Sequence, residues 1–230
     1  FEHVLKQYEK AYPEFSFLGA SPIDFDKPLG SSCVWPKMCK FTLSKAESED
    51  KTKIGLIFNE DYHYQEGSHW ICAFLDIPKK TFYFIDSVGN PMPKEVSSFA
   101  DRLSRESETL YGEKLSIVAS TMPHQRGNNQ CGMYCLFFII SLLTGTATYD
   151  ELMQERIPDG AMQELRQFLF RHANSTGKHA KSKSTPKLSR KLGAAPKGRS
   201  KTRRNKGKGD KRIRTARKQR RTKQRHSKRK

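Results

Sequence analysis

The chain has 230 residues, with 43 Lys and Arg against 24 Asp and Glu and a formal net charge of +19. The charge is concentrated: residues 175–230 contain 25 basic residues and one acidic residue, a net of +24, and residues 1–174 keep 18 basic and 23 acidic residues, a net of −5. The first 174 residues are enough for one domain with a substantial core and too few for two. No apolar run approaches the ~20 residues that cross a bilayer, which excludes an integral membrane protein.

The five cysteines are odd in number and irregular in spacing. That pattern predicts no disulfide framework and is typical of a reducing compartment. Cys33 and Cys39 lack a second pair of ligands nearby, so no metal site is expected. The opening Phe1-Glu2-His3 is polar and is not typical of a signal peptide. No cofactor is expected, and activation by DNA or by a peptide is left open.

The first half of the chain shows one helical pattern followed by strand patterns. Residues 4–12 have the amphipathic spacing of a short helix that ends before Pro13. Residues 15–28 contain two prolines and two aspartates and are expected to form a loop. The turn 77–80 is expected to join the last two of three strands as an antiparallel hairpin. The three predicted strands are residues 54–58, 70–75 and 81–85.

The second half alternates helical patterns with one further strand. Residues 93–110 have helical spacing with Pro93 in the first turn, and residues 115–118 are expected to form a strand. Residues 132–143 are apolar on all sides, which is typical of a helix buried in the centre of a domain. Residues 165–172 are expected to form a last helix. Together these elements predict an α+β domain over residues 1–174, with a central, mostly antiparallel sheet packed on the buried helix.

The basic segment 175–230 contains no aromatic residue and almost no aliphatic ones. Such a segment buries too little apolar surface to offset its ordering entropy, so it is expected to be disordered when free. Its charge favours contact with nucleic-acid phosphates without sequence preference. The alternative is a solubilising or nuclear-import tail. The residues expected to contact nucleic acid are Lys201, Arg203, Arg204, Lys211, Arg212, Arg214, Arg217, Lys218, Arg220 and Arg221.

Cys131 and Gly132 stand where a polar loop (125–130) gives way to the predicted buried helix. The positive end of the helix dipole and its free N–H groups favour a thiolate and a developing oxyanion there. Gly132, which has no side chain, would let a substrate backbone approach closely. By itself this pattern is weak, because a Cys-Gly pair at a helix start is usually a packing feature.

His69 and Asp86 stand at the two ends of the predicted hairpin that lie side by side. Asp86 is therefore expected to accept a hydrogen bond from the His69 ring, which leaves the other ring nitrogen to deprotonate Cys131. The side-chain amide of Gln125 and the backbone N–H of Cys131 are expected to donate to the oxyanion. These four residues form a complete set for nucleophilic catalysis.

Two further histidines and one further cysteine are expected to have no catalytic role. His63 and His124 compete with His69 as bases, but neither has a matching acid in the sequence pattern, and both are expected to be exposed in loops. Cys135 lies one helical turn after Cys131 and is expected to pack in the core.

The string His69-Trp70, Asp86-Ser87 and Gln125-x-x-Asn128-x-x-Cys131-Gly132 resembles the active-site signature of the ubiquitin-like-protein-specific proteases and adenain. The flanking residues look closest to the thiol proteases of large DNA viruses, including the asfarvirus polyprotein protease. The resemblance covers residues 54–143. One departure is Gln130, where cellular de-SUMOylating enzymes usually have Asp.

The resemblance implies a papain-like domain of the adenain type that cleaves after small residues, in Gly-Gly-x or Gly-x-Gly sequences. Trp70 would cover the glycines of the substrate, and Trp35 is a weaker candidate for the opposite wall, with plain core packing as its alternative. The implied partner is a protein substrate, and the enzyme is expected to act as a monomer.

The favoured hypothesis is a viral cysteine endopeptidase that processes structural polyproteins in the virion and in the host cytoplasm, with the nucleus as an alternative location because of the basic tail. A host-directed deubiquitinating or de-SUMOylating protease shares every catalytic residue. An effector-type acetyltransferase with a similar triad is a more distant alternative. A nucleic-acid-packaging protein with an inactive protease fold is the alternative from another class.

Overall fold

The computed structural model describes residues 1–170, so the predictions made for residues 171–230, including the basic tail, lie outside the described part. Five strands form one mixed sheet in the order β1-β4-β5-β6-β7. Their bounds are Phe15–Pro22 (β1), Lys53–Asn59 (β4), Trp70–Asp76 (β5), Thr81–Ile85 (β6) and Ser116–Ala119 (β7).

The three central strands form the antiparallel part of the sheet, and the predicted hairpin is confirmed. Strands β4, β5 and β6 are antiparallel neighbours, and β5 and β6 form the expected hairpin. The two edge strands are instead parallel to their neighbours, β1 to β4 and β7 to β6. The sheet is therefore mixed, with its antiparallel part in the centre.

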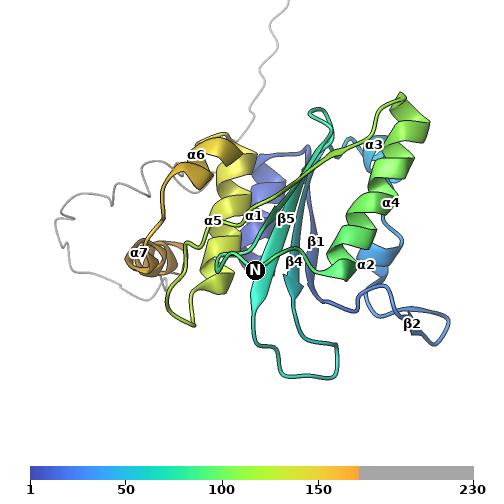
Figure 1. Cartoon of the computed structure of the whole chain (residues 1–230). Helices are drawn as coiled ribbons and strands as arrows, with labels where there is room; N and C mark the ends of the chain where they lie inside the picture. Colours follow the sequence, from blue (N-terminus) through green and yellow to red (C-terminus); the bar gives the residue numbers. More distant parts are fainter. Residues whose placement is uncertain (171–230) are drawn as a thin grey trace, which may run out of the picture. The chain divides into compact units, whose positions relative to one another are not determined.

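Helices cover both faces of the sheet (Figure 1). α1, α5, α6 and α7 lie on one face, and α2, α3 and α4 lie on the other. Their bounds are Glu2–Ala11 (α1), Pro36–Cys39 (α2), Leu43–Ser48 (α3), Lys94–Tyr111 (α4), Cys131–Thr144 (α5), Tyr149–Gln154 (α6) and Asp159–Leu169 (α7). Among the helices of the described part, none is long and apolar enough to cross a membrane.

Helix α5 is the predicted central helix, and it is buried along most of its length. Tyr134, Phe138 and Ile139 are almost fully excluded from solvent and pack between the sheet and the outer helices. Each large apolar side chain buried in this way stabilises the fold by roughly 2 kcal/mol. The helix begins at Cys131 and ends at Thr144, and Gly145 follows with the left-handed φ of +66° that is common directly after a helix. The fold therefore places Cys131 at the N-terminus of the buried central helix.

The prediction of a loop over residues 15–28 is wrong for residues 15–22, which form the edge strand β1. Residues 23–27 are turn and bend, as predicted. The side chains of Phe15 and Phe17 are buried in the core, and the strand contains an irregularity between Phe17 and Ala20. A proline at the end of an edge strand leaves no ladder hydrogen bond unmade, so Pro22 is tolerated. The last helix, α7, also begins six residues before the predicted position.

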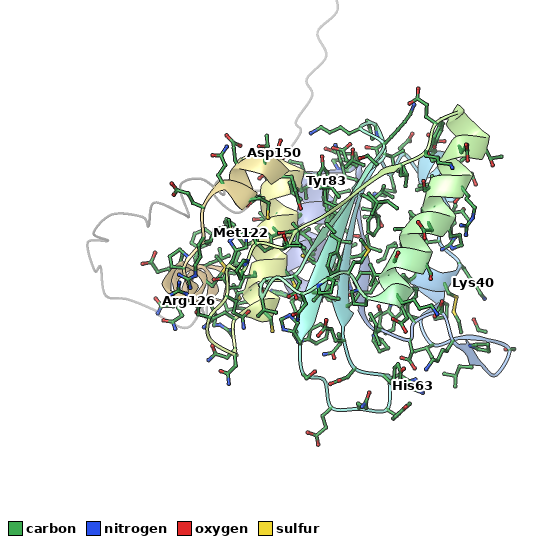
Figure 2. The ribbon with its side chains drawn as sticks, in the orientation of Figure 1. Lys40, His63, Tyr83, Met122, Arg126 and Asp150 are labelled. Carbon is green, nitrogen blue, oxygen red and sulfur yellow. A yellow bond between two sulfur atoms is a disulfide. The ribbon has the colours of Figure 1, made fainter. Side chains whose placement is uncertain are left out.

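One disulfide is present, although the cysteine pattern predicts no disulfide framework. Cys33 and Cys39 are joined by a disulfide (Figure 2). Cys33 ends the short hairpin β2 (Pro28–Leu29) and β3 (Ser32–Cys33), and Cys39 ends α2. Since the chain turns back between these elements, the two Cα atoms come within 6.7 Å. The other cysteines, Cys72, Cys131 and Cys135, are free and buried.

Candidate active site

The hairpin brings His69 and Asp86 together as expected. His69 precedes the first residue of β5, and Asp86 follows the last residue of β6. The Nε2 atom of His69 lies 2.6 Å from Oδ1 of Asp86, which is fully buried. The Asp86 carboxylate also accepts the backbone N–H groups of Val88 at 3.1 Å and Asn90 at 2.9 Å. These contacts hold the carboxylate, and through it the orientation of the imidazole ring.

Cys131 lies beside this pair, and its environment favours the thiolate. Burial alone raises the pKa of the Cys131 thiol. The His69 ring and the backbone N–H groups of Trp70 and Gly132 lower this pKa by more, so the net shift is downward. Burial lowers the pKa of His69, but hydrogen bonds with Asp86 and Cys131 outweigh it and raise the pKa to about 10. The favoured state is therefore a thiolate next to an imidazolium.

Gln125 is buried, and both ends of its amide are already held. The hydroxyl of Ser87 donates to Oε1 at 2.9 Å, and Nε2 donates to the carbonyl of Gly127 at 2.5 Å. One of the two amide hydrogens is therefore used inside the protein, and the second remains for a ligand. The role of Ser87 in holding the Gln125 amide is not predicted from the sequence, where its only signal is its position directly after Asp86.

Two cavities meet at Trp70, which is half-buried. One, of about 370 Å³, is lined by Cys131, Gly132 and Phe1. The other, of about 360 Å³, is lined by Trp35 together with residues of the loop before β5. Both tryptophans thus border the same space, and Trp35 is held there by a 3.0 Å hydrogen bond from its Nε1 to the carbonyl of Leu18. Trp35 therefore lines a cavity that Trp70 also borders, and its role in substrate binding stays a prediction.

Gly132 faces a protein side chain in this structure. A Cβ atom at this position would lie 2.9 Å from the ring of Phe1, so the glycine is what lets the ring approach. The Phe1 ring also packs edge-to-face on Trp70, with the centroids 5.0 Å apart. The space predicted for a substrate backbone above Gly132 is therefore bordered by Phe1.

The predictions for the competing histidines are partly wrong. His63 is exposed in a loop, as expected. His63 does have an acid, because its Nδ1 atom lies 2.8 Å from Oδ2 of the buried Asp24. His124 is fully buried rather than exposed, and its Nδ1 accepts the N–H of Ile157 at 3.1 Å. Burial lowers the pKa of His124 to about 4, with the charge of Arg156 adding to the effect. Cys135 is buried in the core, as expected.

A buried thiol at a helix N-terminus, with an adjacent histidine and its carboxylate on a mixed sheet, is the arrangement expected of the papain-like fold of the adenain type. A model of the Ulp1 protease family, C-terminal catalytic domain, matches residues 36–180. The chain therefore belongs to the Ulp1 protease family.

Among curated proteins, the chain is similar to viral thiol proteases. It is 28% identical to R355 of Acanthamoeba polyphaga mimivirus, named as a thiol protease, over 75% of this chain and 55% of that protein. It is 26% identical to the SUMO-1 cysteine protease S273R of African swine fever virus (isolate Pig/Kenya/KEN-50/1950), over 58% of this chain and 50% of that protein. The chain spans about half the length of the curated relatives it matches.

Two solved structures share the fold. The African swine fever virus pS273R protease superposes with a TM-score of 0.65 and 22% identity, over 75% of this chain and 66% of that one. The C-terminal protease domain of yeast Ulp1, in complex with the SUMO orthologue SMT3, gives a TM-score of 0.51 and 19% identity, over 73% and 71%. These likenesses confirm the predicted fold class.

Proposed function

We propose that the protein is a cysteine endopeptidase in which Cys131, His69, Asp86 and Gln125 are the catalytic residues. The observation that carries the proposal is the contact of His69 with both Asp86 and Cys131, together with the lowered pKa of the thiol. No other cysteine in the described part of the chain has a histidine placed in this way.

The proposed reaction follows the chemistry of a thiolate and an imidazolium. The Cys131 sulfur attacks the carbonyl carbon of the scissile peptide, and the carbonyl oxygen becomes negative. The free N–H of Gln125 and the backbone N–H of Cys131 at the start of α5 stabilise this oxyanion. His69 gives its proton to the leaving amine as the C–N bond breaks, which leaves an acyl-enzyme. His69 then takes a proton from water, the hydroxide attacks the thioester, and the thiolate is released.

We propose that cleavage follows small residues, in Gly-Gly-x sequences, and matures viral structural polyproteins inside assembling particles in the host cytoplasm. The support for a narrow site is that Trp70 and Phe1 crowd the space beside Cys131 and Gly132. The similarity to proteases of large DNA viruses supports a viral substrate.

The test is covalent labelling with a vinyl-sulfone peptide that ends in Gly-Gly. Wild type and Cys135→Ala should be labelled, and Cys131→Ala should not, because Cys135 is buried and burial raises its pKa. Cys135→Ala is the matched control, since it removes a thiol one helical turn away. Absence of labelling in wild type, with and without added DNA, would overturn the proposal in favour of an inactive protease fold that packages nucleic acid.

A second candidate is a protease that removes ubiquitin or a ubiquitin-like protein from host proteins. It is favoured by a relative named as a SUMO-1 cysteine protease and by the fold shared with Ulp1 bound to SMT3. The two candidates are distinguished by their preferred substrate. The test compares kcat/KM on fluorogenic ubiquitin and SUMO reporters with kcat/KM on a short Gly-Gly-x peptide. A kcat/KM at least tenfold higher on either reporter would favour this candidate.

We propose that the basic tail binds nucleic acid through its lysines and arginines and so concentrates the protease on packaged genome. The support is the contrast in net charge between residues 175–230 and residues 1–174, +24 against −5.

A further inference from the structure

The loop between β7 and α5 carries Gln125 and leads into Cys131, but it has no regular secondary structure. Its shape therefore depends on contacts from other elements. One contact is Ser87, whose carbonyl accepts the N–H groups of His124 at 2.8 Å and Gln125 at 2.7 Å. Since Ser87 follows Asp86, this contact joins the loop to the turn that holds the catalytic acid.

The second contact is Asp159, the first residue of α7. Its carboxylate accepts the backbone N–H groups of Arg126 at 3.2 Å and Gly127 at 2.9 Å. It also accepts the hydroxyl of Tyr134, on α5, at 2.8 Å. Figure 2 shows Arg126 beside α7, where this contact is made. One side chain thus links the loop to two helices.

The carboxylate is held in its charged form. Burial raises the pKa of Asp159, but the N–H of Gly127, the hydroxyl of Tyr134, the N–H of Arg126 and the charge of Arg156 lower it more. A charged acceptor makes stronger hydrogen bonds to backbone N–H groups than a neutral one.

Gly127, whose N–H is held by Asp159, also orients the Gln125 amide through its carbonyl. A carbonyl can only accept, so the Gly127 carbonyl requires the Nε2 end of the amide to face it. The Oε1 end then faces the hydroxyl of Ser87. The amide is therefore oriented with one N–H committed to Gly127 and one left over, and a shift of the Gly127 backbone would turn that second N–H away.

We propose that Asp159 is a positioning residue for the oxyanion site, acting through the backbone of Arg126 and Gly127 on the amide of Gln125. The proposal rests on the proposed role of Gln125. Asp159 does not touch the reacting atoms, and no sequence motif points to it, because it lies 28 residues after Cys131 at the start of another helix.

The test is a double-mutant cycle of Gln125→Ala and Asp159→Asn, measured as kcat/KM on a fluorogenic Gly-Gly peptide. Loss of one oxyanion donor typically lowers kcat by roughly 100-fold or more. We expect Gln125→Ala to lose about that much, and Asp159→Asn about tenfold, mostly in kcat. Because Asp159 acts through Gln125, adding Asp159→Asn to Gln125→Ala should cost less than twofold more.

Two further measurements separate positioning from general loss of structure. Asp159→Asn should weaken inhibition by a Gly-Gly peptide aldehyde about tenfold, because the bound hemithioacetal places an oxyanion in the same site. It should leave the rate of Cys131 alkylation by iodoacetamide within twofold, because alkylation forms no oxyanion. Glu164→Gln, an exposed carboxylate on the same helix, is the matched control and should leave all rates unchanged.

The failures are distinct. A wild type that does not turn over the peptide contradicts the proposed specificity. A Gln125→Ala variant with wild-type kinetics contradicts the role of Gln125 and, with it, that of Asp159. Two results would overturn the role of Asp159 alone, provided that Gln125→Ala lowers kcat/KM. One is that Asp159→Asn has no effect. The other is that Asp159→Asn lowers kcat/KM by the same factor in Gln125→Ala as in wild type.

Discussion

Burial has the largest effect on the charge state of Cys131, and among the neighbouring residues His69 has the largest. Because the pKa of the thiol is lowered and that of His69 is raised to about 10, the thiolate persists below the ordinary cysteine range. In His69→Ala the hydrogen bond and positive charge are lost while the burial remains. The pH midpoint of iodoacetamide alkylation should then rise above wild type by more than about one unit, towards or beyond ~8.5. His63→Ala is the control, because His63 pairs with Asp24; equal midpoints in wild type and His69→Ala would contradict the ion pair.

At the scale of elements, the segment from β3 to α2 places Trp35 against the cavity that Trp70 also borders. The disulfide between Cys33 and Cys39 closes this segment into a small loop. Replacing both cysteines with serine should free the loop and raise the KM for a Gly-Gly peptide severalfold. We expect kcat to stay within twofold, because Cys131 and His69 are not in this segment. The free energy of unfolding should fall by about 2 kcal/mol, in line with closure of a short loop.

Steady-state kinetics and urea unfolding check this expectation, and Lys37→Ala, an exposed change in the same loop, serves as the control. Wild type treated with a phosphine reductant should behave like the double variant. An unchanged KM in both would mean that the Trp35 ring is held by its own contacts with Leu18 and Gly19.

The elements also show which parts of this fold can be predicted from the sequence. The hairpin of β5 and β6 is local, so the pattern of apolar residues and the turn predicted both strands and the meeting of His69 with Asp86. Strand β1 was missed because it pairs in parallel with β4, more than thirty residues later, and its own residues include a proline. The contact of Asp159 with the loop before Cys131 is also long-range and depends on the position of α7.

At the scale of the whole molecule, the buried apolar residues of the described part end at Leu165, well before the basic tail. Truncation after Asn174 should therefore leave the thermal unfolding midpoint and kcat/KM on a short peptide unchanged. It should abolish DNA binding, because the remaining residues carry a net charge of −5. For the full chain, release of counterions predicts that DNA affinity falls by roughly 10³-fold or more between about 50 and about 200 mM salt. Fluorescence anisotropy with random-sequence duplex DNA measures both. Salt-insensitive binding would contradict the proposed contacts with phosphates. Binding retained by the truncated chain would show that the nucleic-acid site lies in residues 1–174 instead of the tail.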